Sequence, residues 1–163
     1  MEKKTPKTRL CWWLLGAVFL LAVVLAPGPA AAQLIVDSIQ PGVGTPYTIP
    51  NDLNYTDEYV GYSGTGVLYQ NSYLNTVTSG LRVGLNSGSS GTYNLSGGTL
   101  TGGTGTPSGF ETIGVAGTGT FNQTGGANTV ADNNLNLGLD PGSSGTYNLS
   151  VGSLTVSGGT STY

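Results

Sequence analysis

The feature that most constrains the fold of this chain is an internal repeat. The nine residues GSSGTYNLS occur at 88–96 and again, unchanged, at 142–150. Around them, EYVGYSGTGVLYQ at 58–70 matches ETIGVAGTGTFNQ at 111–123, so a unit of about 53 residues occurs twice. A repeat of this length indicates a supersecondary unit that buries a continuous core only when copies of it stack.

Each unit divides again into two shorter coils. The segment GTFNQTGGANTV at 119–130 aligns without gaps with GTYNLSGGTLTG at 91–102. Short stretches of alternating apolar residues are separated by Gly, Asn, Ser and Pro, which is typical of short strands between turns. The sequence therefore predicts an all-β fold, a right-handed parallel β-helix (β-solenoid) of about four coils. These coils start near Glu58, Leu81, Glu111 and Leu135, after a cap or lead-in over residues 33–57.

Residues at equivalent repeat positions are expected to form ladders along the axis of the solenoid. We expect two inward ladders, one aliphatic and one mainly aromatic, and a third ladder of asparagines joined by hydrogen bonds. The aliphatic ladder comprises Val60, Val83, Ile113 and Leu137. The aromatic ladder comprises Leu68, Tyr93, Phe121 and Tyr147, and the asparagine ladder comprises Asn94, Asn122 and Asn148.

Three further repeat positions alternate between polar and apolar residues from coil to coil. The polar residues are Glu58, Gln70 and Asn75 in the first coil and Glu111, Gln123 and Asn128 in the third. The second and fourth coils have leucine at all three positions: Leu81, Leu95 and Leu100, then Leu135, Leu149 and Leu154. Either these positions lie at a half-exposed edge, or the polar groups are buried and must be paired. We favour the edge.

The N-terminus has the pattern of a cleavable secretory signal. Basic residues are followed by an apolar run over 10–26, which would form a signal helix, and then by small residues. We expect a signal peptidase to read Ala30 and Ala32 and to cleave before Gln33, which removes residues 1–32. An uncleaved membrane anchor is the alternative. The protein is thus expected to be exported. Its final location would be the medium, the outer surface of the cell or the periplasm.

The composition of residues 33–163 excludes several functions. Arg82 is the only basic residue there, and seven acidic residues leave a net charge of −6. Binding to nucleic acid requires several Lys or Arg residues, so we expect no nucleic-acid partner, and no membrane embedding of the mature chain. The absence of His, Cys and Lys excludes His- and Cys-based nucleophiles, Schiff-base chemistry and His- or Cys-based zinc sites. We expect no catalytic, cofactor-binding or metal-binding residues.

Polysaccharide cleavage is the enzymatic alternative. Glu58 and Glu111 occupy one repeat position two coils apart, which is about 9.6 Å and near the spacing of inverting glycosidases. The repeat itself explains this pair, and no other charged residue aligns with it. The segment at 102–110 resembles a repeat-type calcium motif but lacks its Asp, and the Thr-x-Thr pairs do not recur at one repeat position, so we expect no threonine array.

The repeats YVGYSGTG, GTFNQTGGANTV and GSSGTYNLSGGTL resemble those of large exported bacterial surface proteins. These are the β-solenoid passengers of autotransporter-like proteins and related proteins with a C-terminal PEP-type sorting anchor. The resemblance covers residues 58–163 and implies a structural or adhesive surface module without catalytic activity. The sequence shows neither a translocator barrel nor an anchor helix, so a non-functional fragment of a longer autotransporter-like protein is a further alternative.

The expected partner is an unidentified surface glycan or protein. End-to-end self-association through an uncapped last coil is a second expectation, because an uncovered strand edge can pair with another chain.

Overall fold

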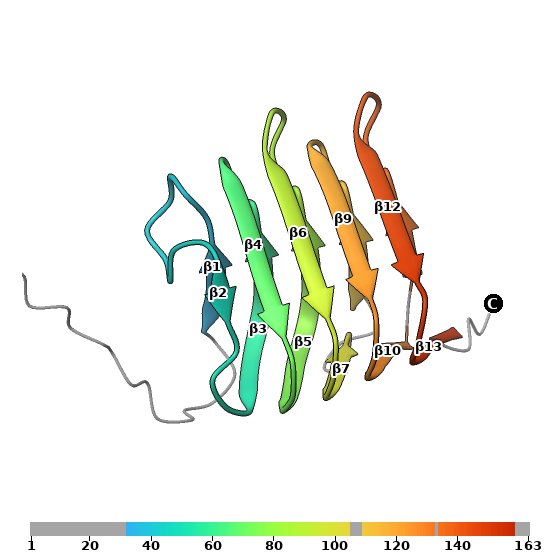
Figure 1. Cartoon of the computed structure of the whole chain (residues 1–163). Helices are drawn as coiled ribbons and strands as arrows, with labels where there is room; N and C mark the ends of the chain where they lie inside the picture. The colour runs from blue at the N-terminus through green and yellow to red at the C-terminus, as the bar shows by residue number, and fades with distance from the viewer. Residues whose placement is uncertain (1–31, 105–108, 133, 159–163) are drawn as a thin grey trace, which may run out of the picture.

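The structure is a computed structural model that describes residues 32–104, 109–132 and 134–158 (Figure 1). These residues form thirteen β-strands and no helix. All pairs among these strands are parallel, and the described part of the chain is an all-β solenoid. The expected signal helix and Ala30 of the expected cleavage site lie outside the described residues.

The strands form three columns of stacked rungs. Column 1 consists of β1 (Gln33–Val36), the second halves of β3 (Leu53–Val60) and β5 (Leu74–Val83), β8 (Phe110–Ile113) and β11 (Asn134–Leu137). Column 2 consists of β2 (Tyr47–Thr48), β4 (Thr65–Gln70), β6 (Ser90–Leu95), β9 (Thr118–Gln123) and β12 (Ser144–Leu149). Column 3 consists of the first halves of β3 and β5, then β7 (Thr99–Gly102), β10 (Ala127–Asp132) and β13 (Ser153–Gly158). Figure 1 shows the four longer strands of column 2 side by side with their arrows aligned.

The solenoid has about five turns, one more than the four coils expected from the repeats. We number the turns by their column 1 strands, so that turns 1 to 5 begin with β1, β3, β5, β8 and β11. The additional turn is the segment before residue 57, which pairs in register with turn 2 through Leu34 with Glu58 and Tyr47 with Leu68. The sequence alignment missed this turn because it rested on glycines that turn 1 does not share.

The interior is filled by ladders of stacked side chains. Val60, Val83 and Ile113 are fully buried in column 1. Tyr93 and Phe121 are fully buried in column 2 and stack with ring centroids 4.8 Å apart and planes 8° apart. Tyr147 continues the stack at 4.6 Å from Phe121. The last turn is less covered, so Tyr147 is only partly buried and Leu137 is 49% exposed.

Glycine is required where column 1 bends into column 2. Gly114 follows β8 with a φ of +77°, a conformation that L side chains rarely adopt. Gly119 begins the inward side of β9, and a Cβ there would collide with the carbonyl oxygen of Val83 and the amide nitrogen of Gly114. The equivalent residues Gly66, Gly91 and Gly145 meet the corresponding carbonyl of the preceding turn. These glycines let the backbone of one turn lie against the next.

Asp37 fastens turn 1 to turn 2. Its Oδ1 accepts hydrogen bonds from the amides of Ile39 and Gln40, at 2.6 and 3.0 Å, and its Oδ2 accepts two at 2.9 Å from Ser63 and Gly64. Burial by itself would raise the pKa of Asp37, but the four amide donors outweigh it and lower the pKa to about 2. The carboxylate therefore remains charged and bonded across the neutral and mildly acidic range.

Gly119→Ala should destabilise the fold by about 1–3 kcal/mol, because the added methyl group forces the backbones of turns 3 and 4 apart. Urea denaturation followed by far-UV circular dichroism would measure the change. Gly102→Ala is the matched control, since its Cβ would meet only the Cγ of Glu111, at 4.0 Å. A Gly119→Ala midpoint equal to that of Gly102→Ala would contradict the close backbone approach.

Candidate functional site

The alternating polar residues lie in the interior of the solenoid. Glu58, Gln70 and Asn75 of turn 2 and the equivalent residues of turn 4 are all 0% exposed. The interpretation that placed these positions at a half-exposed edge is therefore wrong. The side chains at these positions all point inward from the three columns, and buried polar groups in a protein interior need partners.

The first network joins turn 2 to the tyrosine of turn 3. The amide nitrogen of Asn75 donates to Glu58 Oε2 at 2.8 Å and to the hydroxyl of Tyr93 at 3.1 Å. The Tyr93 hydroxyl donates to Gln70 Oε1 at 2.5 Å. Gln70 in turn donates through Nε2 to the backbone carbonyls of Tyr73 and Thr99, at 3.1 and 2.9 Å.

The second network repeats the first one two turns later. Asn128 donates to Glu111 Oε2 at 2.9 Å and to the Tyr147 hydroxyl at 3.2 Å. Tyr147 donates to Gln123 Oε1 at 2.6 Å, and Gln123 donates to the carbonyls of Gly126 and Ser153. The same arrangement at two independent positions shows that it is a property of the repeat.

These networks account for the alternation that the sequence analysis left unexplained. Turns 2 and 4 supply Glu, Gln and Asn, and the turn after each supplies a tyrosine whose hydroxyl connects them. Turns 2 and 4 themselves have Leu68 and Phe121 at the tyrosine position, without a hydroxyl, and they stack on apolar turns. Turn 1 also follows the rule, because its Leu34 and Leu53 pair with Glu58 and Asn75.

Burial dominates the electrostatics of both carboxyl groups. Desolvation raises the pKa of Glu58 to about 7, against the lowering effect of the Asn75 hydrogen bond, and the charge of Glu111 raises it further. Desolvation likewise raises the pKa of Glu111 to about 7, and Asn128 opposes this. Burial raises the pKa of Tyr147 to about 12 and that of Tyr93 well above 10, so both tyrosines are neutral hydrogen-bond donors.

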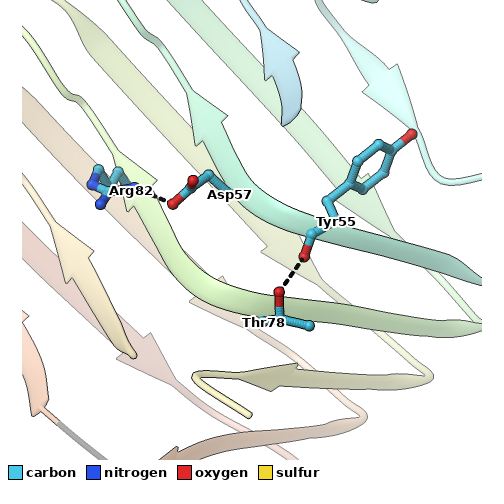
Figure 2. Close-up of polar contacts among 4 residues, drawn as sticks. All are labelled: Tyr55, Asp57, Thr78 and Arg82. Carbon is cyan, nitrogen blue, oxygen red and sulfur yellow. Dashed lines mark hydrogen bonds and ion pairs between the residues drawn. The ribbon is translucent and has the colours of Figure 1, made fainter. Parts of the chain in front are cut away.

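The only basic side chain of residues 33–163 lies outside this interior. Arg82 Nη1 is 2.8 Å from Asp57 Oδ1, and its guanidinium lies 4.3 Å from the ring centre of Phe110 and 5.2 Å from that of Tyr59. Figure 2 shows the Arg82–Asp57 pair beside the bond from the Thr78 hydroxyl to the Tyr55 carbonyl, at 3.4 Å. This surface cluster ties β3 to β5 where the chain turns from column 3 to column 1.

The outer faces carry rows of small polar side chains. In column 2, Asn148 donates to Asn122 at 2.9 Å, Asn122 to Asn94 at 3.0 Å, and Asn94 to the carbonyl of Leu68 at 3.4 Å. Single threonines also align from turn to turn, although the Thr-x-Thr pairs do not recur at one repeat position: Thr99 pairs with Ala127, and Thr118 pairs with Ser90 and Ser144. The threonine rows are Thr92, Thr120 and Thr146 in column 2 and Thr76, Thr101, Thr129 and Thr155 in column 3.

The structure separates the two glutamates that were weighed as a catalytic pair. Glu58, Leu81 and Glu111 are consecutive partners in column 1, so an apolar layer lies between the carboxyl groups. Neither carboxyl reaches the surface, where a polysaccharide would have to bind. Over the described residues, no group of three or more acidic, His or Cys side chains gathers in a way that could hold a metal ion.

Ala32 and Gln33, on either side of the expected cleavage site, form backbone contacts with β3. The carbonyl of Ala32 accepts a hydrogen bond from the amide of Thr56 at 3.0 Å, and Gln33 pairs with Asp57. In the part of the chain that is described, no helix has the length and hydropathy needed to cross a membrane.

Comparison with protein families, curated proteins and solved structures finds no match to this chain.

Tyr93→Phe should destabilise the solenoid by about 1–3 kcal/mol, because it leaves Gln70 and Asn75 buried without one partner each. Thermal and urea denaturation would measure the loss. Tyr69→Phe removes a hydroxyl from the adjoining strand on the outer side, where Tyr69 is 39% exposed, and should leave stability within about 0.5 kcal/mol. Equal midpoints for the two variants would contradict a connecting role for the Tyr93 hydroxyl.

Proposed function

We propose that this protein is an exported structural or adhesive surface module, without catalytic activity, whose solenoid acts as a stiff spacer. The observation that supports this most is the continuous register: each of the three columns runs through five parallel rungs. We further propose that the coil is right-handed, as crossovers between parallel strands nearly always are. A rod of this kind works by spacing and presenting its surface.

The hydrogen bonds in the interior support a structural role for the buried Glu, Gln and Asn side chains. The two glutamates bond to the asparagine of their own turn, and the two glutamines and two asparagines also bond to the next turn. The outer rows consist of hydroxyl and amide side chains, which suit contact with a surface glycan or a protein through hydrogen bonds. The resemblance of the repeats to exported bacterial surface proteins supports the proposed location.

The chain, expressed with its leader in an exporting bacterial host, should be recovered outside the cytoplasm with Gln33 as its first residue. The folded product should resist added protease and release no reducing sugar from polysaccharides, because both glutamates are buried. Mass spectrometry, gel electrophoresis and a reducing-sugar assay would measure these three results.

Two outcomes would contradict this proposal. The first concerns the cleavage site, with Ala31→Leu as the matched control. If the Ala30→Leu/Ala32→Leu variant is exported and cleaved like this control, the proposed signal-peptidase site is wrong. Sugar release that disappears in Glu58→Gln and Glu111→Gln would support the polysaccharide-active alternative.

We also propose that a second copy of this chain associates with the last turn. Large apolar side chains are exposed there, with Leu149 49% and Val151 63% exposed, and β12 pairs with β9 alone among the described strands. An apolar surface next to a strand edge that pairs with no further described strand can pair with an identical surface around a two-fold axis. The second copy would cover this edge and these side chains.

Leu149→Lys should shift the protein from dimer to monomer, because a charge at the free edge opposes pairing with a second copy. Sedimentation equilibrium would measure the molar mass over a range of concentrations. Ile39→Lys, at an apolar residue of turn 1 that is 71% exposed, is the matched control and should leave the dimer intact. A wild-type chain that is monomeric at all concentrations would contradict the proposal.

A further inference from the structure

Each polar network ends in two oxygen atoms without a partner. Glu58 Oε1 and Asn75 Oδ1 are buried and accept no hydrogen bond, and the same holds for Glu111 Oε1 and Asn128 Oδ1. In both networks the carboxyl and the amide already share one bond, from the asparagine nitrogen to Oε2. In both networks, two side chains already joined by one hydrogen bond each bury a second oxygen that is unpaired. A proton on the carboxyl group would give both of these oxygens a partner.

No basic group is placed to compensate a charge on either glutamate. Arg82 is the sole basic residue of the solenoid sequence, and it pairs with Asp57 on the outside. An isolated carboxylate in an apolar interior is strongly unfavourable, and such a group becomes neutral instead. Column 1 also places apolar residues directly above and below each glutamate, with Leu81 between the two.

We propose that Glu58 and Glu111 are protonated carboxylic acids in the folded protein, each donating its proton to the unpaired oxygen of its asparagine. The pair of Glu58 and Asn75 then forms two hydrogen bonds, one in each direction, and Glu111 with Asn128 does the same. Each proton converts Oε1 from an unpaired acceptor into a donor and satisfies the Oδ1 of the asparagine. Each acid–amide pair thereby links column 1 to column 3 within its own turn and carries no charge.

Apart from the other glutamate, the titratable groups facing each glutamate are tyrosines, which are neutral at neutral and mildly acidic pH. Tyr47, Tyr55 and Tyr93 influence Glu58 from column 2 and from β3 itself, and burial raises the pKa of each of them above its ordinary value of 10. Tyr147 is the tyrosine bonded to the Glu111 network, and its pKa of about 12 also keeps it neutral. The charge of Glu111 raises the pKa of Glu58, which favours protonation of Glu58.

The raised pKa of the two glutamates makes the stability of the folded protein decrease as the pH rises. Both glutamates have a folded pKa of about 7 against an ordinary value of 4.5, so the folded state binds more protons between these limits. Stability should therefore be greatest near pH 4.5, fall as the pH rises to about 7, and then level off. Within this window each glutamate weakens the folding equilibrium by up to about tenfold per pH unit. Asp37 acts in the opposite direction only below about pH 4, since its pKa is lowered to about 2.

Carbon-13 NMR of the full chain, labelled at the glutamate Cδ, would observe the protons directly. The chain has three glutamates, and Glu58→Gln and Glu111→Gln assign two signals by removing each in turn. We expect the signals of Glu58 and Glu111 to shift with midpoints near pH 7. Two signals that titrate near pH 4.5 in the folded wild-type protein would overturn the proposal, and counting these signals requires no variant.

Urea denaturation from pH 4.5 to pH 8.5 tests the consequence for stability. Glutamine matches a protonated glutamate in shape and keeps a donor toward the asparagine, so the Glu58→Gln/Glu111→Gln variant should lose the pH dependence and exceed the wild type above pH 7. Asp140→Asn, which removes a carboxylate from an exposed residue of turn 5, is the matched control and should keep the wild-type slope. A double glutamine variant with the wild-type slope would overturn the proposal.

Discussion

The interior of this solenoid depends on pairing the Glu, Gln and Asn side chains that stacking buries. A tyrosine hydroxyl connects Gln and Asn side chains of the preceding turn, and the glutamate completes each network. Because an unpaired buried polar group costs about 1–3 kcal/mol, a turn with Glu, Gln and Asn is tolerated only where the next turn presents a hydroxyl. The smallest unit in which the buried Gln and Asn side chains find their tyrosine partner is therefore two turns.

The same requirement determines whether tyrosine or phenylalanine occupies the aromatic position of column 2. Tyr93 and Tyr147 follow polar turns and use their hydroxyls, whereas Phe121 between them contributes only its ring to the stack. A hydroxyl on Phe121 would face Leu95 and Leu100 of the preceding turn, which offer it no side-chain partner. The choice between Tyr and Phe at one repeat position thus reflects the polarity of the turn before it.

The repeat in the sequence predicted the parallel solenoid because the glycines recur where adjacent backbones touch, as at Gly119. Two features were not predicted. Turn 1 lacks the repeated glycines and matches its neighbours only in inward side chains such as Leu34 and Leu53, a signal too short to separate from chance. The burial of Glu58 and Glu111 was missed because polarity normally indicates exposure, and their partners lie 17 or more residues away in the chain.

The two-turn unit also has a consequence for alignment of the turns. In the native register each turn with Glu, Gln and Asn stacks on turns with leucine. A slip of one turn would stack Glu, Gln and Asn on residues of the same kind and would leave the tyrosine hydroxyl facing an apolar turn. A slip of two turns would restore the pairing, so the networks distinguish adjacent turns although the glycine corners of all four later turns are alike. Buried polar groups are known to specify register in other stacked structures at some cost in stability. Here the neutral form of the carboxyl groups keeps that cost small, since the specificity comes from hydrogen bonds and requires no buried charge.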